Sequence, residues 1–143
     1  MILYLDTSAI VKLYTVELGS ADVKRWVSGA EDVVSSLIAY AETRAALARK
    51  HRMRQMNEKQ LNAHKNEFEK DWTGFLKVPA DAHLVRIAGE LAERYGLKGY
   101  DAMHLASADQ IHREVRSPIW FACFDTALRT AAAKLGLKLA TIP

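Results

Sequence analysis

Four acidic residues of this chain lie next to apolar segments or within them, and these are Asp6, Glu42, Asp101 and Asp125. Asp6 directly follows the apolar run 2–5, and Asp125 directly follows the apolar run 119–124. A carboxylate in apolar surroundings is destabilising unless its charge is compensated, and several together raise one another's pKa. A bound divalent cation removes both problems, and Mg2+ and Mn2+ prefer oxygen ligands. The residue types therefore predict a hard-cation site, which could activate water for hydrolysis.

Each acidic residue also has a purely structural interpretation. Asp6 and Asp125 could be helix N-caps, a position that favours Asp. Asp101, near the start of a predicted helix, could balance the helix dipole, and Glu42 could pair with a basic neighbour such as Arg44. The coincidence of all four at one plausible sheet edge favours a functional site.

Other titratable residues near these acids give weaker signals. His104 lies three residues after Asp101, so both can face one side of a helix; a catalytic role for it stays open but is not favoured, because cation-assisted hydrolysis does not need it. Asp109 is predicted to be solvated or salt-bridged. The single cysteine, Cys123, is predicted to be buried, and the histidines show no His-x-x-x-His spacing that would suggest a softer metal site.

Alternating strands and helices would position the acidic residues. Strands are predicted at 2–5, 33–35, 75–78, 119–124 and 137–142, and helices at 7–14, 21–28, 37–52, 58–72, 82–95, 100–115 and 126–136. The expected N-caps are Thr7 or Ser8, Ser20, Ser36 and Asp81, with Gly96 as a C-cap. This alternation indicates a parallel sheet covered by helices on both faces, with sites beyond the carboxyl ends of the strands.

Size and composition fit one compact domain spanning 1–143. The chain has 143 residues, of which 50% are apolar and 26% charged, and a net charge of +3. No apolar stretch is long enough to span a bilayer, and the N-terminus lacks the features of a signal peptide. We therefore expect a cytoplasmic protein with no membrane partner and a mild preference for anionic ones.

The segments around the four acids resemble the motifs of PIN-domain nucleases, in order and over essentially the whole chain. These segments are Leu5–Tyr14, Ala41–Leu47, Tyr100–Ala108 and Phe124–Leu128. The size and the opening segment are especially similar to VapC-type toxins of toxin–antitoxin pairs. The resemblance implies a three-layer α/β/α fold with a central, mainly parallel sheet of four or five strands.

The same resemblance implies a metal-dependent endoribonuclease that binds Mg2+ or Mn2+. Its catalytic and metal-binding residues would be Asp6, Glu42, Asp101 and Asp125, with Asp6 and Asp101 the most direct ligands. Thr7, Ser8 and Thr126 would orient the carboxylates or a water molecule. The implied partners are RNA, a second copy in a homodimer, and a cognate antitoxin protein.

A basic strip follows Glu42 in the sequence. The segment 44–54 contains basic residues and no acidic ones, and its candidate substrate-binding residues are Arg44, Arg49, Lys50 and Arg52. Such a strip suits the phosphates of RNA and predicts salt-dependent binding. The alternative is a solvated helix end, where basic residues also favour the dipole.

Three other function classes remain open. A receiver-like Mg2+-binding phospho-acceptor domain requires an acceptor Asp at the end of a middle strand, but the strand at 75–78 meets Pro79, and Asp81 lies beyond it. A phosphohydrolase of the haloacid-dehalogenase type requires Asp at position 8, which is Ser8. A non-catalytic RNA-binding PIN-like protein is disfavoured by the intact acidic residues.

Overall fold

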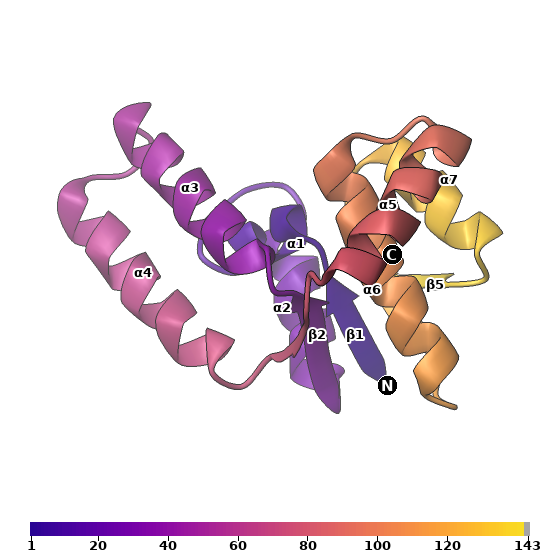
Figure 1. The fold of residues 1–143 in the computed structure, drawn as a ribbon. Helices are drawn as coiled ribbons and strands as arrows, with labels where there is room; N and C mark the ends of the chain where they lie inside the picture. Colours follow the sequence, from indigo (N-terminus) through magenta and orange to yellow (C-terminus); the bar gives the residue numbers. More distant parts are fainter. Residues whose placement is uncertain (142–143) are drawn as a thin grey trace.

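A five-stranded parallel sheet forms the centre of the molecule (Figure 1), a computed structural model that describes residues 1–141. Its strand order is β3-β2-β1-β4-β5. The strands are β1 (Ile2–Leu5), β2 (Asp32–Ser36), β3 (Leu76–Val78), β4 (Ile119–Ala122) and β5 (Lys138–Leu139). All five predicted strands form, although β5 is shorter than the predicted 137–142, whose last residue lies outside the described part of the chain.

Seven helices connect and flank these strands in the described residues. They are α1 (Thr7–Lys12), α2 (Ser20–Gly29), α3 (Ala39–Arg52), α4 (Glu58–Trp72), α5 (Ala82–Tyr95), α6 (Gly99–Glu114) and α7 (Thr126–Lys134). In the part of the chain that is described, no helix has the length and apolar content needed to cross a membrane.

The alternation of side chains along β1 separates two hydrophobic cores. Tyr4 faces the core shared with α5, α6 and α7, and it stacks on Phe121 of β4. Leu3 and Leu5 face the opposite core, shared with α1 to α4. Helices therefore cover both faces of the sheet (Figure 1), as predicted for a three-layer α/β/α fold.

The sheet reverses its strand order at β1. The chain moves from β1 to β2 and β3 on one side, whereas β4 and β5 lie on the other. Leu5 is in register with Ala122, and the Asp6 amide donates to the carbonyl oxygen of Ala122 at 3.2 Å. The carboxyl ends of β1 and β4 thus meet at a topological switch point, the usual place for a site in such sheets.

The predicted N-caps of α1 and α2 are wrong. The N-cap of α1 is Asp6, whose carboxylate accepts from the Ala9 amide, and not Thr7 or Ser8. Helix α2 begins at Ser20 after a left-handed Gly19, so Ser20 is not its cap. A Cβ atom at position 19 would lie 2.7 Å from the ring of Phe124, so both the positive φ and the packing require glycine there.

Other helix ends behave as predicted or differ slightly. Asp81 caps α5 through the Leu84 amide, and Gly96 ends this helix in a left-handed conformation. Asn57 caps α4 with a capping box. The predicted Ser36 cap of α3 is wrong as well, because Ser36 ends β2 and the N-cap of α3 is Ile38, although the Ser36 hydroxyl still accepts from the Ile38 amide at 3.3 Å.

Candidate active site

The carboxyl ends of β1 and β4 carry the first and last predicted acidic residues. Asp6 follows β1 directly and is 5% exposed, whereas Asp125 follows β4 by a short turn and is exposed. Both carboxylates are N-caps, because Asp6 Oδ1 accepts from the Ala9 amide and Asp125 Oδ1 accepts from the Leu128 amide, each at 2.9 Å. The structural interpretation of these two residues is thus correct, and it leaves a second role open.

The two helical acids face the same edge. Glu42 lies in the first turn of α3 and Asp101 in the first turn of α6. Asp101 is close enough to Asp6 for its charge to raise the pKa of Asp6, and Asp125 and Glu42 act on Asp101 in the same way. The fold therefore gathers all four predicted acids into one electrostatically coupled cluster.

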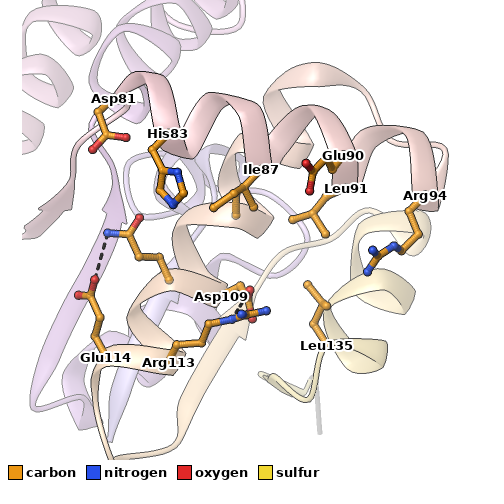
Figure 2. Close-up of a pocket in the computed structure, with 12 residues that line it drawn as sticks. Asp81, His83, Ile87, Glu90, Leu91, Arg94, Asp109, Arg113, Glu114 and Leu135 are labelled. Carbon is orange, nitrogen blue, oxygen red and sulfur yellow. Dashed lines mark hydrogen bonds and ion pairs between the residues drawn. The ribbon is translucent and has the colours of Figure 1, made fainter.

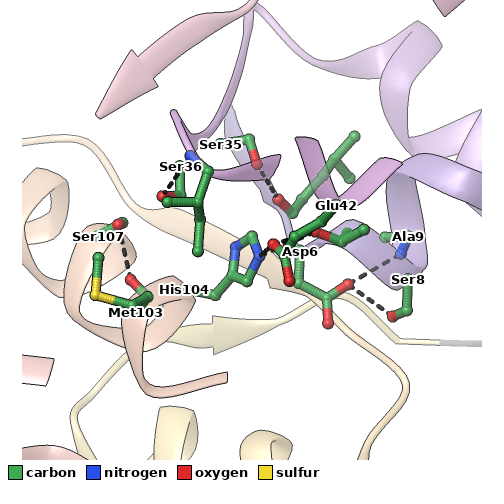
Figure 3. A network of polar contacts seen from close by, with 12 residues as sticks. Asp6, Ser8, Ala9, Ser35, Ser36, Glu42, Met103, His104 and Ser107 are labelled. Carbon is green, nitrogen blue, oxygen red and sulfur yellow. Dashed lines mark hydrogen bonds and ion pairs between the residues drawn. The ribbon is translucent and has the colours of Figure 1, made fainter. Parts of the chain in front are cut away.

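Three of the four carboxylates share a pattern in which one oxygen accepts hydrogen bonds and the other does not. Asp6 Oδ1 accepts from the Ser8 hydroxyl at 2.7 Å as well as from the Ala9 amide (Figure 3). Glu42 Oε1 accepts from the Thr7 hydroxyl at 2.7 Å and lies 2.8 Å from His104 Nε2. No described residue donates to Asp6 Oδ2, Glu42 Oε2 or Asp125 Oδ2, so these oxygens can bind something else.

Burial and mutual repulsion set the protonation of this cluster. Burial raises the pKa of Asp6, and Asp101 raises it further, so the charge of His104 and the bonds from Ala9 and Ser8 do not fully compensate. Burial also raises the pKa of Asp101, with added repulsion from Asp125 and Glu42. A cluster in which two carboxylates resist ionisation is one that an added positive charge would stabilise.

Glu42 behaves differently from the two aspartates. Burial acts to raise its pKa, but hydrogen bonds from His104 and Thr7 and the charge of His104 outweigh burial and lower it. The alternative interpretation, in which Glu42 pairs with a basic neighbour such as Arg44, does not hold for Arg44, which pairs with Glu69 at 2.8 Å. Glu42 is therefore kept ionised by groups at the site itself.

His104 is the residue that sequence reasoning undervalued. It is 2% exposed, and its ring lies between Tyr4, whose hydroxyl is 2.9 Å from Nδ1, and Glu42. The available signal was its position three residues after Asp101, which places both on one side of α6. Its partner Tyr4 gave no such signal, because an aromatic residue within the apolar run 2–5 is what a buried strand normally contains.

The three predicted hydroxyl residues occupy different places. Thr7 contacts both Glu42 and His104, and Ser8 contacts Asp6. Thr126 is exposed at the start of α7, and its carbonyl oxygen accepts from Thr130. Two of the three thus hold carboxylates of the cluster.

The predicted basic strip is partly neutralised. Arg44 donates to Glu69 and to the Tyr40 hydroxyl, and Lys50 pairs with Glu17 at 2.9 Å. Arg49 and Arg52 are exposed and form no ion pair with any residue from 1 to 141. These two arginines are consequently the available cations on α3.

The cluster fits the chemistry of a hard divalent cation without forming a complete cage. Its donors are carboxylate oxygens, and the raised pKa values of Asp6 and Asp101 mark a deficit of positive charge. Within residues 1–141, no three His, Cys, Asp or Glu side chains are placed to hold one ion. Mg2+ commonly uses only one or two carboxylates together with water and substrate phosphates, so the predicted four-ligand set need not be assembled in advance.

A separate cavity of about 470 Å³ lies between α5 and α6 (Figure 2). Its lining includes His83, Glu90, Arg94 and the buried Asp109, but none of the four clustered acids. Arg113 Nε donates to Asp109 Oδ2 at 2.9 Å, which confirms that Asp109 is salt-bridged. This cavity is not part of the acidic cluster.

The sequence matches the PIN domain over residues 3–134. The chain belongs to the PIN-domain family. Among relatives of this PIN domain is Ribonuclease VapC49 of Mycobacterium tuberculosis strain H37Rv, which is 36% identical over 140 residues that cover 97% of this chain and 94% of that protein. The resemblance to VapC-type proteins therefore extends along nearly the whole of both chains.

Solved structures share the fold of this PIN domain. VapC20 of M. tuberculosis, described as a toxin that cleaves the sarcin–ricin loop, has a TM-score of 0.66 and 20% identity, covering 90% of this chain and 94% of that one. A toxin–antitoxin complex from Klebsiella pneumoniae has a TM-score of 0.58 and 18% identity, covering 87% of each chain. At these identities the comparisons establish the α/β/α fold of the PIN domain.

Proposed function

We propose that this PIN-domain protein is an endoribonuclease dependent on Mg2+ or Mn2+, and the toxin of a cytoplasmic toxin–antitoxin pair. The observation that carries the proposal is the coupled cluster of Asp6, Glu42, Asp101 and Asp125 at the switch point of the sheet. The 36% identity to a VapC ribonuclease supports RNA as the substrate. The toxin–antitoxin complex of the same fold supports an antitoxin partner, and we retain a homodimer as an expectation from the family.

In this proposal Asp6 and Asp101 hold the cation, and Glu42 and Asp125 complete the site. When bound, the cation would ease deprotonation of a water molecule and offset the charge that develops on the scissile phosphate. The chain itself supplies orientation, because Ser8 and the Ala9 amide hold Asp6. The exposed Arg49 and Arg52 would attract the RNA backbone along α3.

A receiver-like phospho-acceptor function finds no support in the fold. That function needs an acceptor Asp at the end of the third strand along the chain, whereas β3 ends at Val78 and lies at the edge of the sheet. Asp81, the acid that follows it, is an exposed cap of α5. The second candidate that remains is an RNA-binding PIN protein without catalysis.

Cleavage of total RNA by wild type, Asp6→Asn and Asp81→Asn tests the proposal. Asp81 offers a matched control, because its Oδ1 caps a helix at 2.9 Å as Asp6 does but it is outside the cluster. We expect wild type and Asp81→Asn to cleave with Mg2+ or Mn2+ and not with EDTA, and Asp6→Asn to be inactive. Full cleavage by Asp6→Asn would refute the site, and RNA binding without cleavage by wild type would favour the second candidate.

A further inference from the structure

A buried chain of polar side chains runs from the interior of the sheet to the acidic cluster. It begins at Tyr4, which is fully buried on β1, and passes through His104, which is 2% exposed, to Glu42 on α3. Figure 3 shows the His104 ring pointing at Glu42 beside Asp6. The Tyr4 ring meets the His104 ring edge to face at 5.9 Å, so packing also fixes the imidazole.

The ionised carboxylate of Glu42 determines the direction of its hydrogen bond with His104. His104 Nε2 lies 2.8 Å from Glu42 Oε1, which can only accept when ionised, so Nε2 carries a proton and donates it. In a neutral ring Nδ1 is then the acceptor and the Tyr4 hydroxyl, 2.9 Å away, donates to it, whereas in a protonated ring Nδ1 donates to the same hydroxyl. In either state the contact with Tyr4 occupies Nδ1 and leaves Nε2 as the nitrogen that donates to Glu42.

This arrangement holds one particular oxygen of Glu42. Oε1 takes both the bond from His104 and the 2.7 Å bond from Thr7, and no described residue donates to Oε2. A free glutamate side chain would lose considerable rotamer entropy on being ordered by a ligand. The two bonds order this side chain before anything binds to Oε2.

We propose that His104, oriented by Tyr4, is a positioning residue that holds the Glu42 carboxylate so that Oε2 faces the shared site of Asp6 and Asp101. This inference rests on the proposed function, because it assigns a role within the same site. Partners of this kind, which orient a ligand without touching the metal, typically change metal affinity or activity by about 10–100-fold when removed.

Variants at two positions separate positioning from simple packing. His104→Leu removes the donor, and His104→Gln retains an amide donor able to reach Glu42. Tyr4→Phe retains the ring and removes only the hydroxyl. Asp109→Asn is a control in the same helix, since Asp109 is buried but contacts Arg113 and not Glu42.

The readouts are Mn2+ affinity of each folded variant, measured by calorimetry, and the kcat and KM for an RNA oligonucleotide. We expect His104→Leu to lose about 10–100-fold in Mn2+ affinity and kcat with little change in KM. Tyr4→Phe should lose roughly two- to tenfold, as for one neutral hydrogen bond. His104→Gln should recover most of the loss, and Asp109→Asn should match wild type.

Two results would overturn the positioning role. One is wild-type Mn2+ affinity and kcat in His104→Leu; the other is a His104→Gln variant as defective as His104→Leu, because the donor to Glu42 would then be irrelevant. If His104→Leu does not fold, the other two variants test the same role: a small loss in Tyr4→Phe with near-wild-type His104→Gln supports it, and a wild-type Tyr4→Phe or a strongly defective His104→Gln overturns it. Failure of wild type itself to bind Mn2+ and cleave RNA would instead refute the proposed function, and this inference with it.

Discussion

Replacing Asp6 by asparagine should make the metal-free protein more stable while abolishing its activity. Asparagine keeps an acceptor oxygen, so the bonds from Ser8 at 2.7 Å and from the Ala9 amide at 2.9 Å can persist, and Asn is as good an N-cap as Asp. The substitution therefore removes mainly the charge. Because the folded-state pKa of Asp6 is raised, chiefly by burial, the ionised form is disfavoured on folding, and its removal is favourable.

The expected gain is about 0.5–2 kcal/mol in the free energy of unfolding, the common range for a single stabilising substitution. For a chain of this length, each 1 kcal/mol corresponds to a rise in Tm of roughly 2–6 °C. The gain should be complete at pH values above the raised pKa. It should decline as the pH falls toward the ordinary pKa of 3.8 and disappear below it, where Asp6 is protonated in both folded and unfolded wild type.

Thermal unfolding in EDTA, followed by circular dichroism between pH 4 and 8, measures this difference. Asp81→Asn is the control, since this exposed cap lies outside the cluster, and it should change stability by only a few tenths of a kcal/mol at any pH. Adding Mn2+ should stabilise wild type and leave Asp6→Asn unchanged. An Asp6→Asn variant that is less stable than wild type at neutral pH, or whose gain does not vary with pH, would refute the reasoning.

Three further outcomes follow from the structure. In an inactive Asp6→Asn background, replacing Arg49 and Arg52 by alanine should lower the slope of log affinity for single-stranded RNA against log salt by about 1.4, or about 0.7 for each phosphate contact; an unchanged slope would exclude these contacts. Phe68→Ala should lower the free energy of unfolding by about 3–5 kcal/mol in urea titrations, because this ring is fully buried among other aromatic rings; a loss below about 1 kcal/mol would contradict the packing described. Cys123 should resist thiol reagents at pH 8 until the protein unfolds, because burial raises the pKa of its thiol; stoichiometric labelling of native protein would show that this segment opens.

Elements that depend on near neighbours were predictable from the sequence. The N-cap at Asp81 and the C-cap at Gly96 form within one helical turn, and both are confirmed. The N-cap of α2 was predicted wrongly, because Gly19 takes this position in a left-handed conformation and lies against the ring of Phe124, more than 100 residues away in the chain. Local capping rules cannot anticipate a constraint set by a segment so distant in the sequence.

The features of the candidate site also fall into those that follow from local sequence and those that need the tertiary structure. The sequence alone determined that Asp6 and Asp125 end apolar strands, because side-chain type and hydrophobic pattern are local properties, and these suffice to place both at one edge of a parallel sheet. Only the tertiary structure decided that Glu42 accepts hydrogen bonds from Thr7 and His104. It also decided that Arg44 forms an ion pair with Glu69. Such partners are 25 to 62 residues apart along the chain. Which of them meet depends on how the strands are ordered and the helices packed, and the free energy of that arrangement is shared by the whole core.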